Sequence, residues 1–259
     1  MEQGAQIKRG TGKLLHPPSF ARSSRKGWGT GSARPLAPLP GALLPRAFFE
    51  DLPEKVAPRL LGKVLVHTTS AGLLAGRIVE VEAYLGPHNR PPDPAAHSHR
   101  GPTPRNLVIF GPAGHAYVYA IYGRYFCMNV TCEPEGRAGC ILLRALEPIG
   151  ELSLNQMALN RGLAPSAKAR QLTSGPSRLC QALGLTRPAH NGLDLLDPAS
   201  PLQLQDDGFA VSEVLVTPRI GIRHAVDWPL RFALPDHGCV SGPKNWPKTG
   251  LKKLPGRRR

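Results

Sequence analysis

The amino-acid sequence predicts an α+β fold built on antiparallel strands with a few short flanking helices. Two stretches, residues 63–85 and 115–130, alternate apolar and polar side chains on both sides of a short turn, which is typical of antiparallel hairpins. Residues 140–146 are almost wholly apolar and predict a third strand of the same sheet. Helix signals flank these stretches, so we expect the helices to lie beside the sheet.

The expected elements take their limits from turn and capping residues. Asp51 can cap a short helix that has Pro53 in its first turn. Gly162 and Gly184 follow two later helices, because helices commonly stop at a glycine. In chain order we expect a helix at residues 51–61, strands at 63–67 and 73–85, a loop at 87–104, strands at 115–121, 125–130 and 140–146, helices at 151–160 and 174–183, and strands at 202–204, 211–217 and 230–234.

The net charge of +15 comes from the two ends of the chain. Residues 1–46 hold eight basic residues and one acid, residues 240–259 hold seven and none, and the 193 residues between them hold eighteen and seventeen. We therefore predict a basic disordered arm over residues 1–44, a folded domain over 45–239 and a basic disordered tail over 240–259. The composition of the arm is also typical of a mitochondrial transit peptide.

Cysteine, histidine and hydropathy patterns argue against several classes of protein. The five cysteines are odd in number and contain no CxxC pair, which disfavours a zinc ribbon or a thioredoxin-type site and favours reduced thiols in an intracellular protein. No apolar run is long enough to span a bilayer, so we expect no membrane partner. His97 and His99 lie in a loop without further ligands nearby, so we expect no metal.

The strand within residues 76–87 is where we expect the site. Glu80, Glu82 and Tyr84 share one of its faces, and apolar side chains occupy the other. Two carboxylates and a phenol are unusual on a strand with apolar neighbours, because charged groups are rarely buried without a partner or a function. An exposed sheet face, on which both acids meet solvent, is the alternative interpretation.

An aromatic and locally cationic region follows this strand. All five tyrosines lie within residues 84–125, and residues 94–132 contain no acid. Tyr117 and Tyr125 are expected to pack in the core as ordinary strand residues. Tyr122 stands at the tip of the second hairpin, where it is poorly placed for a core, so we expect it to be an exposed wedge.

Arg144 is the one charged residue of the apolar strand at residues 140–146, and it needs a buried acid, for which Glu80 and Glu82 are the candidates. A carboxylate, an arginine and stackable aromatic rings suit a flat substrate linked to an anion, such as a nucleobase on its sugar-phosphate backbone. An enzyme that acts on a base in duplex DNA must extrude it, and stacking on aromatic side chains offsets part of that cost. The helix start at Ser174 and Gly175 can seat a phosphate with its free N–H groups, or serve as a plain cap.

These residues lie in segments that resemble the alkyladenine (3-methyladenine) DNA glycosylase family, in its vertebrate-type form. The resemblance runs from about Phe48 to Leu234 and keeps the order of the family's motifs. It is carried by RIVEVEAYLGP at residues 77–87, AAHS at 95–98, TPRN at 103–106, residues 117–129, LLRALEP at 142–148 and SGPSRLC at 174–180.

The resemblance implies a role for each matched residue. Glu82 is the general base that activates water, and Arg144 and the carbonyl of Ile220 orient that water. Tyr84, His97 and Tyr119 stack on the extruded base, with His99 an alternative to His97 because the preceding loop is longer than the family pattern. The remaining implied roles are exclusion of normal guanine for Asn129, intercalation in the duplex for Tyr122, and contact with the DNA for Thr103, Arg105, Ser174 and Gly175.

The resemblance also implies the fold and the reaction. The family fold is a single compact mixed domain around a curved, largely antiparallel sheet, and it uses no cofactor. The expected reaction is hydrolysis of the N-glycosidic bond of 3-methyladenine, 7-methylguanine, ethenoadenine or hypoxanthine in double-stranded DNA, by a monomer in the nucleus or in the mitochondrion. No lysine lies among the matched motifs, so a lyase step through a Schiff base is not expected.

Two other classes of function are kept open. A glycosidase that acts on sugars uses two carboxylates, and Glu80 and Glu82 share a strand face. A non-catalytic nucleic-acid-binding protein would have the aromatic residues and the basic ends but would need neither Glu82 nor Arg144. Release of a free base from damaged duplexes separates both alternatives from the DNA glycosylase.

Overall fold

The structure is a computed structural model that describes residues 41–242 and 250–253. Within these residues ten strands form one curved sheet, and every strand pairing in it is antiparallel. The predicted α+β class is therefore confirmed. The strands are β1 (Ala42–Leu43), β2 (Val64–Thr69), β3 (Gly72–Tyr84), β4 (Ala116–Ile121), β5 (Tyr125–Cys132), β6 (Gly139–Pro148), β7 (Leu202–Asp206), β8 (Glu213–Thr217), β9 (Arg231–Ala233) and β10 (Leu251–Lys253).

The long strand β3 lies at the centre of the sheet, whose main path runs β1-β7-β2-β3-β6-β5-β4. Strand β6 pairs with one edge of β3, whereas β2 and β9 share the other edge. Along β3, the pairing with β2 runs from Gly72 to Arg77 and the pairing with β9 runs from Glu80 to Glu82, so the partner of this edge changes within β3. The β3–β6 register shifts on both sides of Glu80, which is a bulge of the kind that redirects side chains beside active sites.

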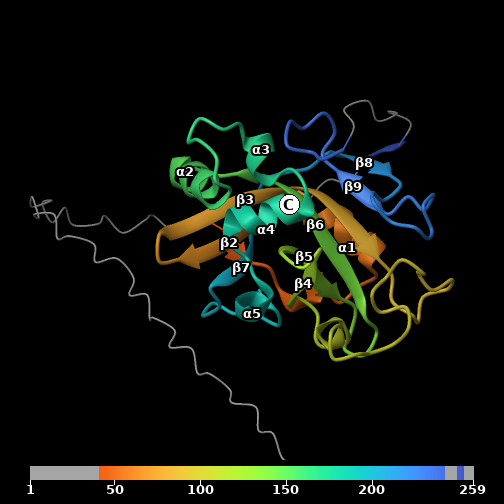
Figure 1. Ribbon diagram of the computed structural model, residues 1–259. Coiled ribbons are helices and arrows are strands. Elements are labelled where there is room, and N and C mark those ends of the chain that lie inside the picture. The colour runs from red at the N-terminus through yellow and green to blue at the C-terminus, as the bar shows by residue number, and fades with distance from the viewer. Residues whose placement is uncertain (1–40, 243–249, 254–259) are drawn as a thin grey trace, which may run out of the picture. The chain divides into compact units, whose positions relative to one another are not determined.

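Helix α4 packs on β5 and β6, and helices α1 and α2 pack on β3. Figure 1 shows α4 across β5 and β6, with α2 and α3 beside it, while β8 and β9 lie at the other end of β3. Helix α1 packs against β3, β6 and β9. The helices are α1 (Pro53–Leu60), α2 (Glu151–Asn160), α3 (Ala169–Thr173), α4 (Pro176–Leu183) and α5 (Arg187–His190), with 3-10 turns η1 (Arg46–Phe48) and η2 (Leu107–Phe110).

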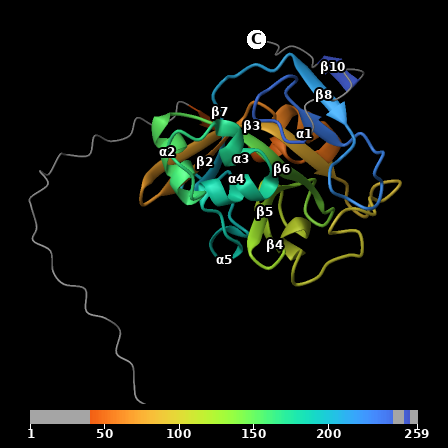
Figure 2. The same cartoon turned by 45° about the horizontal axis from the view of Figure 1, so that its top comes forward.

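The two predicted hairpins are confirmed, and their turns have the conformation that the sequence calls for. Gly72 begins β3 with a φ of 120°, a value that suits glycine because it has no Cβ. At the tip of the β4–β5 hairpin, Tyr122 and Gly123 have φ values of 49° and 71°, as in a type I′ turn. The tip and η2 lie at the end of the fold opposite β8 and β10 (Figure 2).

Ordered structure extends beyond the predicted limits of the domain at both ends. Strand β1 pairs with β7 inside the stretch that was assigned to the basic arm. Ser241 is buried and β10 pairs with β8 inside the stretch that was assigned to the tail. The rest of the predicted arm, residues 1–40, and residues 243–249 and 254–259 of the tail lie outside the described residues. Among the described residues, no helix has the length and apolar content needed to cross a membrane.

Candidate active site

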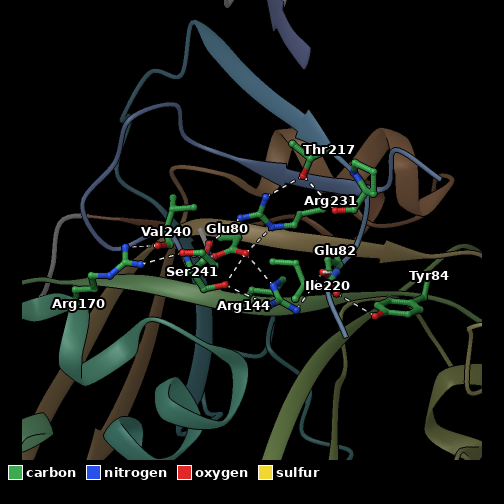
Figure 3. A network of polar contacts seen from close by, with 12 residues as sticks. Glu80, Glu82, Tyr84, Arg144, Arg170, Thr217, Ile220, Arg231, Val240 and Ser241 are labelled. Carbon is green, nitrogen blue, oxygen red and sulfur yellow. Dashed lines mark hydrogen bonds and ion pairs between the residues drawn. The ribbon is translucent and has the colours of Figure 1, made fainter. Parts of the chain in front are cut away.

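Glu80 and Glu82 are both completely buried on β3, so the interpretation as an exposed acidic face is wrong. Each carboxylate is surrounded by hydrogen-bond donors, which offset the cost of removing its charge from water. Figure 3 shows the two groups side by side, with Arg144 between them. The two carboxylates nevertheless have different partners, and this difference assigns them different functions.

Glu82 is held by groups from three separate parts of the chain. Its Oε1 accepts a hydrogen bond of 2.7 Å from the backbone N–H of Ile220 and lies 3.0 Å from Nη1 of Arg144. Its Oε2 accepts a hydrogen bond of 3.0 Å from the Tyr84 hydroxyl. Burial and the negative charge of Glu82 raise the pKa of Tyr84, so this phenol stays protonated and donates to the carboxylate.

The carboxylate oxygens of Glu80 accept hydrogen bonds from two arginines and from Ser241 in the C-terminal segment. Its Oε1 accepts from Nε of Arg144 at 2.8 Å, from Nε of Arg231 at 2.7 Å and from the Ser241 hydroxyl at 2.8 Å. Its Oε2 accepts from the Ser241 N–H at 2.5 Å. Burial alone would raise the pKa of Glu80, but the two guanidinium charges and the Ser241 N–H outweigh it and lower that pKa. Glu80 is therefore a permanent buried anion.

The different partners of Glu80 and Glu82 argue against a glycosidase that uses both carboxylates. Such an enzyme needs two carboxyl groups that face one substrate, and one of them has to give up a proton. Glu80 faces Arg144, Arg231 and Ser241 and is held in its ionised form, so it cannot serve as that acid. Glu82 is the carboxylate at the cavity, because three groups that hold it also line the cavity.

The cavity has a volume of about 670 Å³ and an aromatic wall. Tyr117 and Tyr119 stack with ring centroids 5.3 Å apart, and His97 meets Tyr119 edge-on at 4.5 Å. Nδ1 of His97 is hydrogen-bonded to the Tyr117 hydroxyl at 3.0 Å. Burial lowers the pKa of His97, and the charge of Arg105 adds to this, so the imidazole is neutral at physiological pH.

The structure brings most of the predicted site residues to this one cavity. His97 lines both this cavity and a neighbouring hollow of about 410 Å³, whereas His99 lines the neighbouring hollow and is absent from the wall of the larger cavity. The predicted residues on the cavity wall are Tyr84, His97, Arg105, Tyr119, Tyr122, Asn129, Arg144 and Ile220. Tyr117, which was expected to be a core residue only, is buried and also lines the cavity. Thr103 lines the neighbouring hollow instead.

A second buried ion pair fixes the cavity walls and was not anticipated from the sequence. The Arg219 guanidinium binds both carboxylate oxygens of Asp93, at 2.5 and 3.0 Å, and the Ala83 carbonyl oxygen at 3.0 Å. It also lies 4.6 Å from the centroid of the Tyr84 ring. Since Arg219 precedes Ile220 in the chain, the pair joins the loop that carries the Ile220 amide to β3 and to the loop that carries His97.

The tip of the second hairpin carries the predicted wedge. The Tyr122 side chain is 89% exposed although it borders the cavity. Its positive φ is unusual for a residue other than glycine, and such conformations cluster at functional sites. Arg105 donates to the Ala120 carbonyl oxygen at 3.3 Å and thereby ties the loop before η2 to this hairpin.

Backbone hydrogen bonds occupy the amides of Ser174 and Gly175, where the sequence predicts either a phosphate seat or a plain cap. The Ser174 N–H donates to the Arg170 carbonyl oxygen, and the Gly175 N–H donates to the Arg144 carbonyl oxygen at 2.9 Å. Ser174 is also buried, so neither amide is free for an anion. This helix start serves the site differently, because the Gly175 bond anchors the backbone of Arg144.

Comparison with known proteins agrees with this geometry. The family model of methylpurine-DNA glycosylase (MPG) matches residues 47–238. The chain belongs to the methylpurine-DNA glycosylase family. The chain is accordingly a DNA glycosylase, a hydrolase of DNA repair, as the sequence predicted.

The chain is similar to bacterial and archaeal proteins, each named "Putative 3-methyladenine DNA glycosylase". The protein of Koribacter versatilis is 53% identical over 201 residues, which are 78% of this chain and 94% of that protein. The protein of Rhodopseudomonas palustris is 48% identical over 206 residues, which are 80% of this chain and 91% of that protein. The protein of Methanoculleus marisnigri is 47% identical over 205 residues, which are 76% of this chain and 98% of that protein. The expected vertebrate-type form finds no support among them, and the nuclear or mitochondrial location stays a prediction.

Sequence analysis missed four buried residues that contact the site residues or hold the loops around them: Asp93, Arg219, Arg231 and Ser241. Arg231 carries a signal that could have found it, because it is a lone arginine in a short apolar strand, as Arg144 is. The others lie in loops, where neither periodicity nor spacing marks them. Among the described residues, no group of three or more His, Cys, Asp or Glu side chains is placed to hold a metal ion.

Proposed function

We propose that this glycosylase extrudes alkylated or deaminated purines from double-stranded DNA and hydrolyses their N-glycosidic bond with a water activated by Glu82. The observation that carries the proposal is the Glu82 carboxylate, held by Arg144, Tyr84 and the Ile220 amide at the wall of an aromatic cavity. The substrates would be 3-methyladenine, 7-methylguanine, ethenoadenine and hypoxanthine, and the protein would act as a monomer.

In the proposed step, a water oxygen attacks C1′ of the damaged nucleotide and the C1′–N bond breaks with its electron pair on the departing base. Glu82 accepts the proton that the water loses, and the products are a free base and an abasic site. Arg144 and the carbonyl of Ile220 orient the water. Alkylation at N3 or N7 makes the base cationic and therefore a good leaving group. The residues that line the cavity among those described include no lysine, which favours hydrolysis without a Schiff base.

In this proposal each aromatic residue of the cavity wall helps to hold the base. Tyr84, His97 and Tyr119 stack on the extruded ring, and stacking of this kind contributes roughly 1–3 kcal/mol per base. Asn129 is buried on the same wall, where it would meet the exocyclic amine of a normal guanine. Thr103 and Arg105, which line the neighbouring hollow, would contact the DNA backbone.

One assay tests the proposed function. The protein is incubated with duplexes that carry 3-methyladenine, 7-methylguanine, ethenoadenine or hypoxanthine, and with an undamaged duplex, under single-turnover conditions. We expect free base from at least one damaged duplex and none from the undamaged one, and no strand cleavage until the abasic site is opened by alkali. Binding to damaged DNA without release of a base would instead indicate a passive binder.

Tyr122→Ser is expected to weaken binding to lesion DNA about tenfold or more. The exposed ring would fill the gap that the extruded nucleotide leaves, and without it the unstacked duplex loses that compensation. The measurement is the dissociation constant for a lesion duplex, with 2-aminopurine fluorescence to report extrusion. Phe209→Ser, at an exposed aromatic residue away from the cavity, is the control. Unchanged affinity of the Tyr122 variant would exclude the wedge function.

A further inference from the structure

Behind the Arg144–Glu82 pair lies a cluster of three buried residues that no catalytic function yet accounts for. It consists of Glu80 on β3, Arg231 on β9 and Ser241 in the C-terminal segment, and Figure 3 shows its contacts with Arg144. Ser241 lies beyond residue 238, where the family match ends, and inside the stretch that the sequence assigned to a tail.

Ser241 contacts every charged member of this cluster. Its hydroxyl donates to Glu80 at 2.8 Å and accepts from Nη2 of Arg144 at 3.2 Å. Its N–H donates to Glu80 at 2.5 Å, and its carbonyl oxygen accepts from Arg231 at 3.0 Å. The hydroxyl is thus a bridge between the anchored anion Glu80 and the guanidinium that contacts Glu82.

The three guanidinium nitrogens of Arg144 accordingly have three different partners. Nε binds Glu80, Nη2 binds the Ser241 hydroxyl, and Nη1 remains for Glu82 at 3.0 Å. A guanidinium fixed at two of its corners presents the third in one orientation, whereas one fixed at a single corner can rotate. Glu80 and Ser241 therefore set the direction of Nη1, the nitrogen of Arg144 that faces Glu82.

The segment that carries Ser241 is itself anchored by an arginine on another element. Arg170 of α3 donates to the carbonyl oxygens of Gly238, Val240 and Gly242, at 3.2, 2.6 and 3.2 Å. These bonds lie on both sides of Ser241 along the chain. Arg170 does not line the cavity, and the hydrogen bonds of its guanidinium go to this segment.

We propose that Ser241 is a positioning residue, which Arg170 holds in place and which orients the Arg144 guanidinium, and through it Glu82, for attack by water. The inference rests on the proposed function of Glu82. Neither Ser241 nor Arg170 touches the base, so both act on the rate of bond cleavage and leave recognition of the lesion intact.

The test compares Ser241→Ala with Ser241→Thr, which keeps the hydroxyl. Single-turnover excision is expected to fall about 10-fold to 100-fold in the alanine variant, the range for a catalytic group displaced by a fraction of an ångström to 1 Å, and to recover most of its rate in the threonine variant. The dissociation constant for lesion DNA is expected to change less than twofold. Ser153→Ala is the matched control, because Ser153 is also buried and its hydroxyl accepts a backbone N–H far along the chain, from Ala75.

Arg170→Met gives an independent variant in case Ser241→Ala folds poorly. We expect it to lower the excision rate about tenfold with unchanged lesion affinity, whereas Arg59→Met, which removes another arginine bound to a backbone carbonyl, keeps the wild-type rate. Wild-type excision in the Ser241→Ala and Arg170→Met variants would overturn the proposal, and so would equal losses in Ser241→Ala and Ser153→Ala. Glu82→Gln in the same assay separates the two hypotheses: if it excises normally, the proposed function itself is wrong.

Discussion

Glu82→Gln is expected to slow single-turnover release of a damaged base about 100-fold to 10 000-fold, the range for loss of a general base. The amide cannot accept the proton of the attacking water at neutral pH. Its carbonyl oxygen can still accept from Arg144 and from the Ile220 N–H, the two donors that Oε1 has now. The cavity should therefore persist, and affinity for lesion DNA should stay within about threefold of the wild type.

Two measurements check this prediction: free base released in a single turnover, and the dissociation constant for the same lesion duplex. Glu147→Gln is the matched control, because Glu147 lies on β6 and is about half exposed, with His237 at 3.5 Å as its ion-pair partner. It should leave both quantities unchanged. If the Glu82 variant releases the nucleobase at the wild-type rate, another group is the general base. A parallel loss of binding would show that Glu82 shapes the cavity.

Much of the sheet could be predicted because its strands carry local signals. The hairpin of β2 and β3 alternates with period two around a glycine turn, and α2 begins and ends at the expected residues. Helices α3 and α5 were missed, since five and four residues are too few to show a helical period. The bulge in β3 was missed as well, because it depends on where β2 gives way to β9 along the edge.

The candidate site was predictable where burial conflicts with charge. Arg144 in an apolar strand required an acid, and its side chain meets both acids that were named. The same argument applies to Arg231 and would have found it. Asp93 and Arg219 carry no such conflict in the sequence, because each lies in a polar loop and they are 126 residues apart. Their burial follows only from the way the two loops close over β3.

Asp93→Asn is expected to lower the free energy of unfolding by about 3–5 kcal/mol, the cost of leaving a buried charge without its partner. The side chains of Asp93 and Arg219 are both completely buried, and Nε of Arg219 has no hydrogen-bond partner among the residues that the structure describes. Asp93 also accepts the Leu85 N–H with Oδ2 and the Ala95 N–H with Oδ1, and asparagine has only one oxygen, so one of these two bonds to the loop that carries His97 is lost. Excision should fall with stability, because the Ile220 amide follows Arg219 in the chain.

Urea unfolding at pH 7 measures this effect, and a second Arg–Asp pair supplies the control. Arg77 and Asp207 form the same two-bond contact at the surface, so Asp207→Asn should cost no more than about 1 kcal/mol. The double variant Asp93→Leu, Arg219→Met removes both charges and should be more stable than Asp93→Asn, since no uncompensated guanidinium remains. If Asp93→Asn and Asp207→Asn cost the same, the buried pair contributes no more than a surface contact. The walls of the cavity would then be held by packing alone.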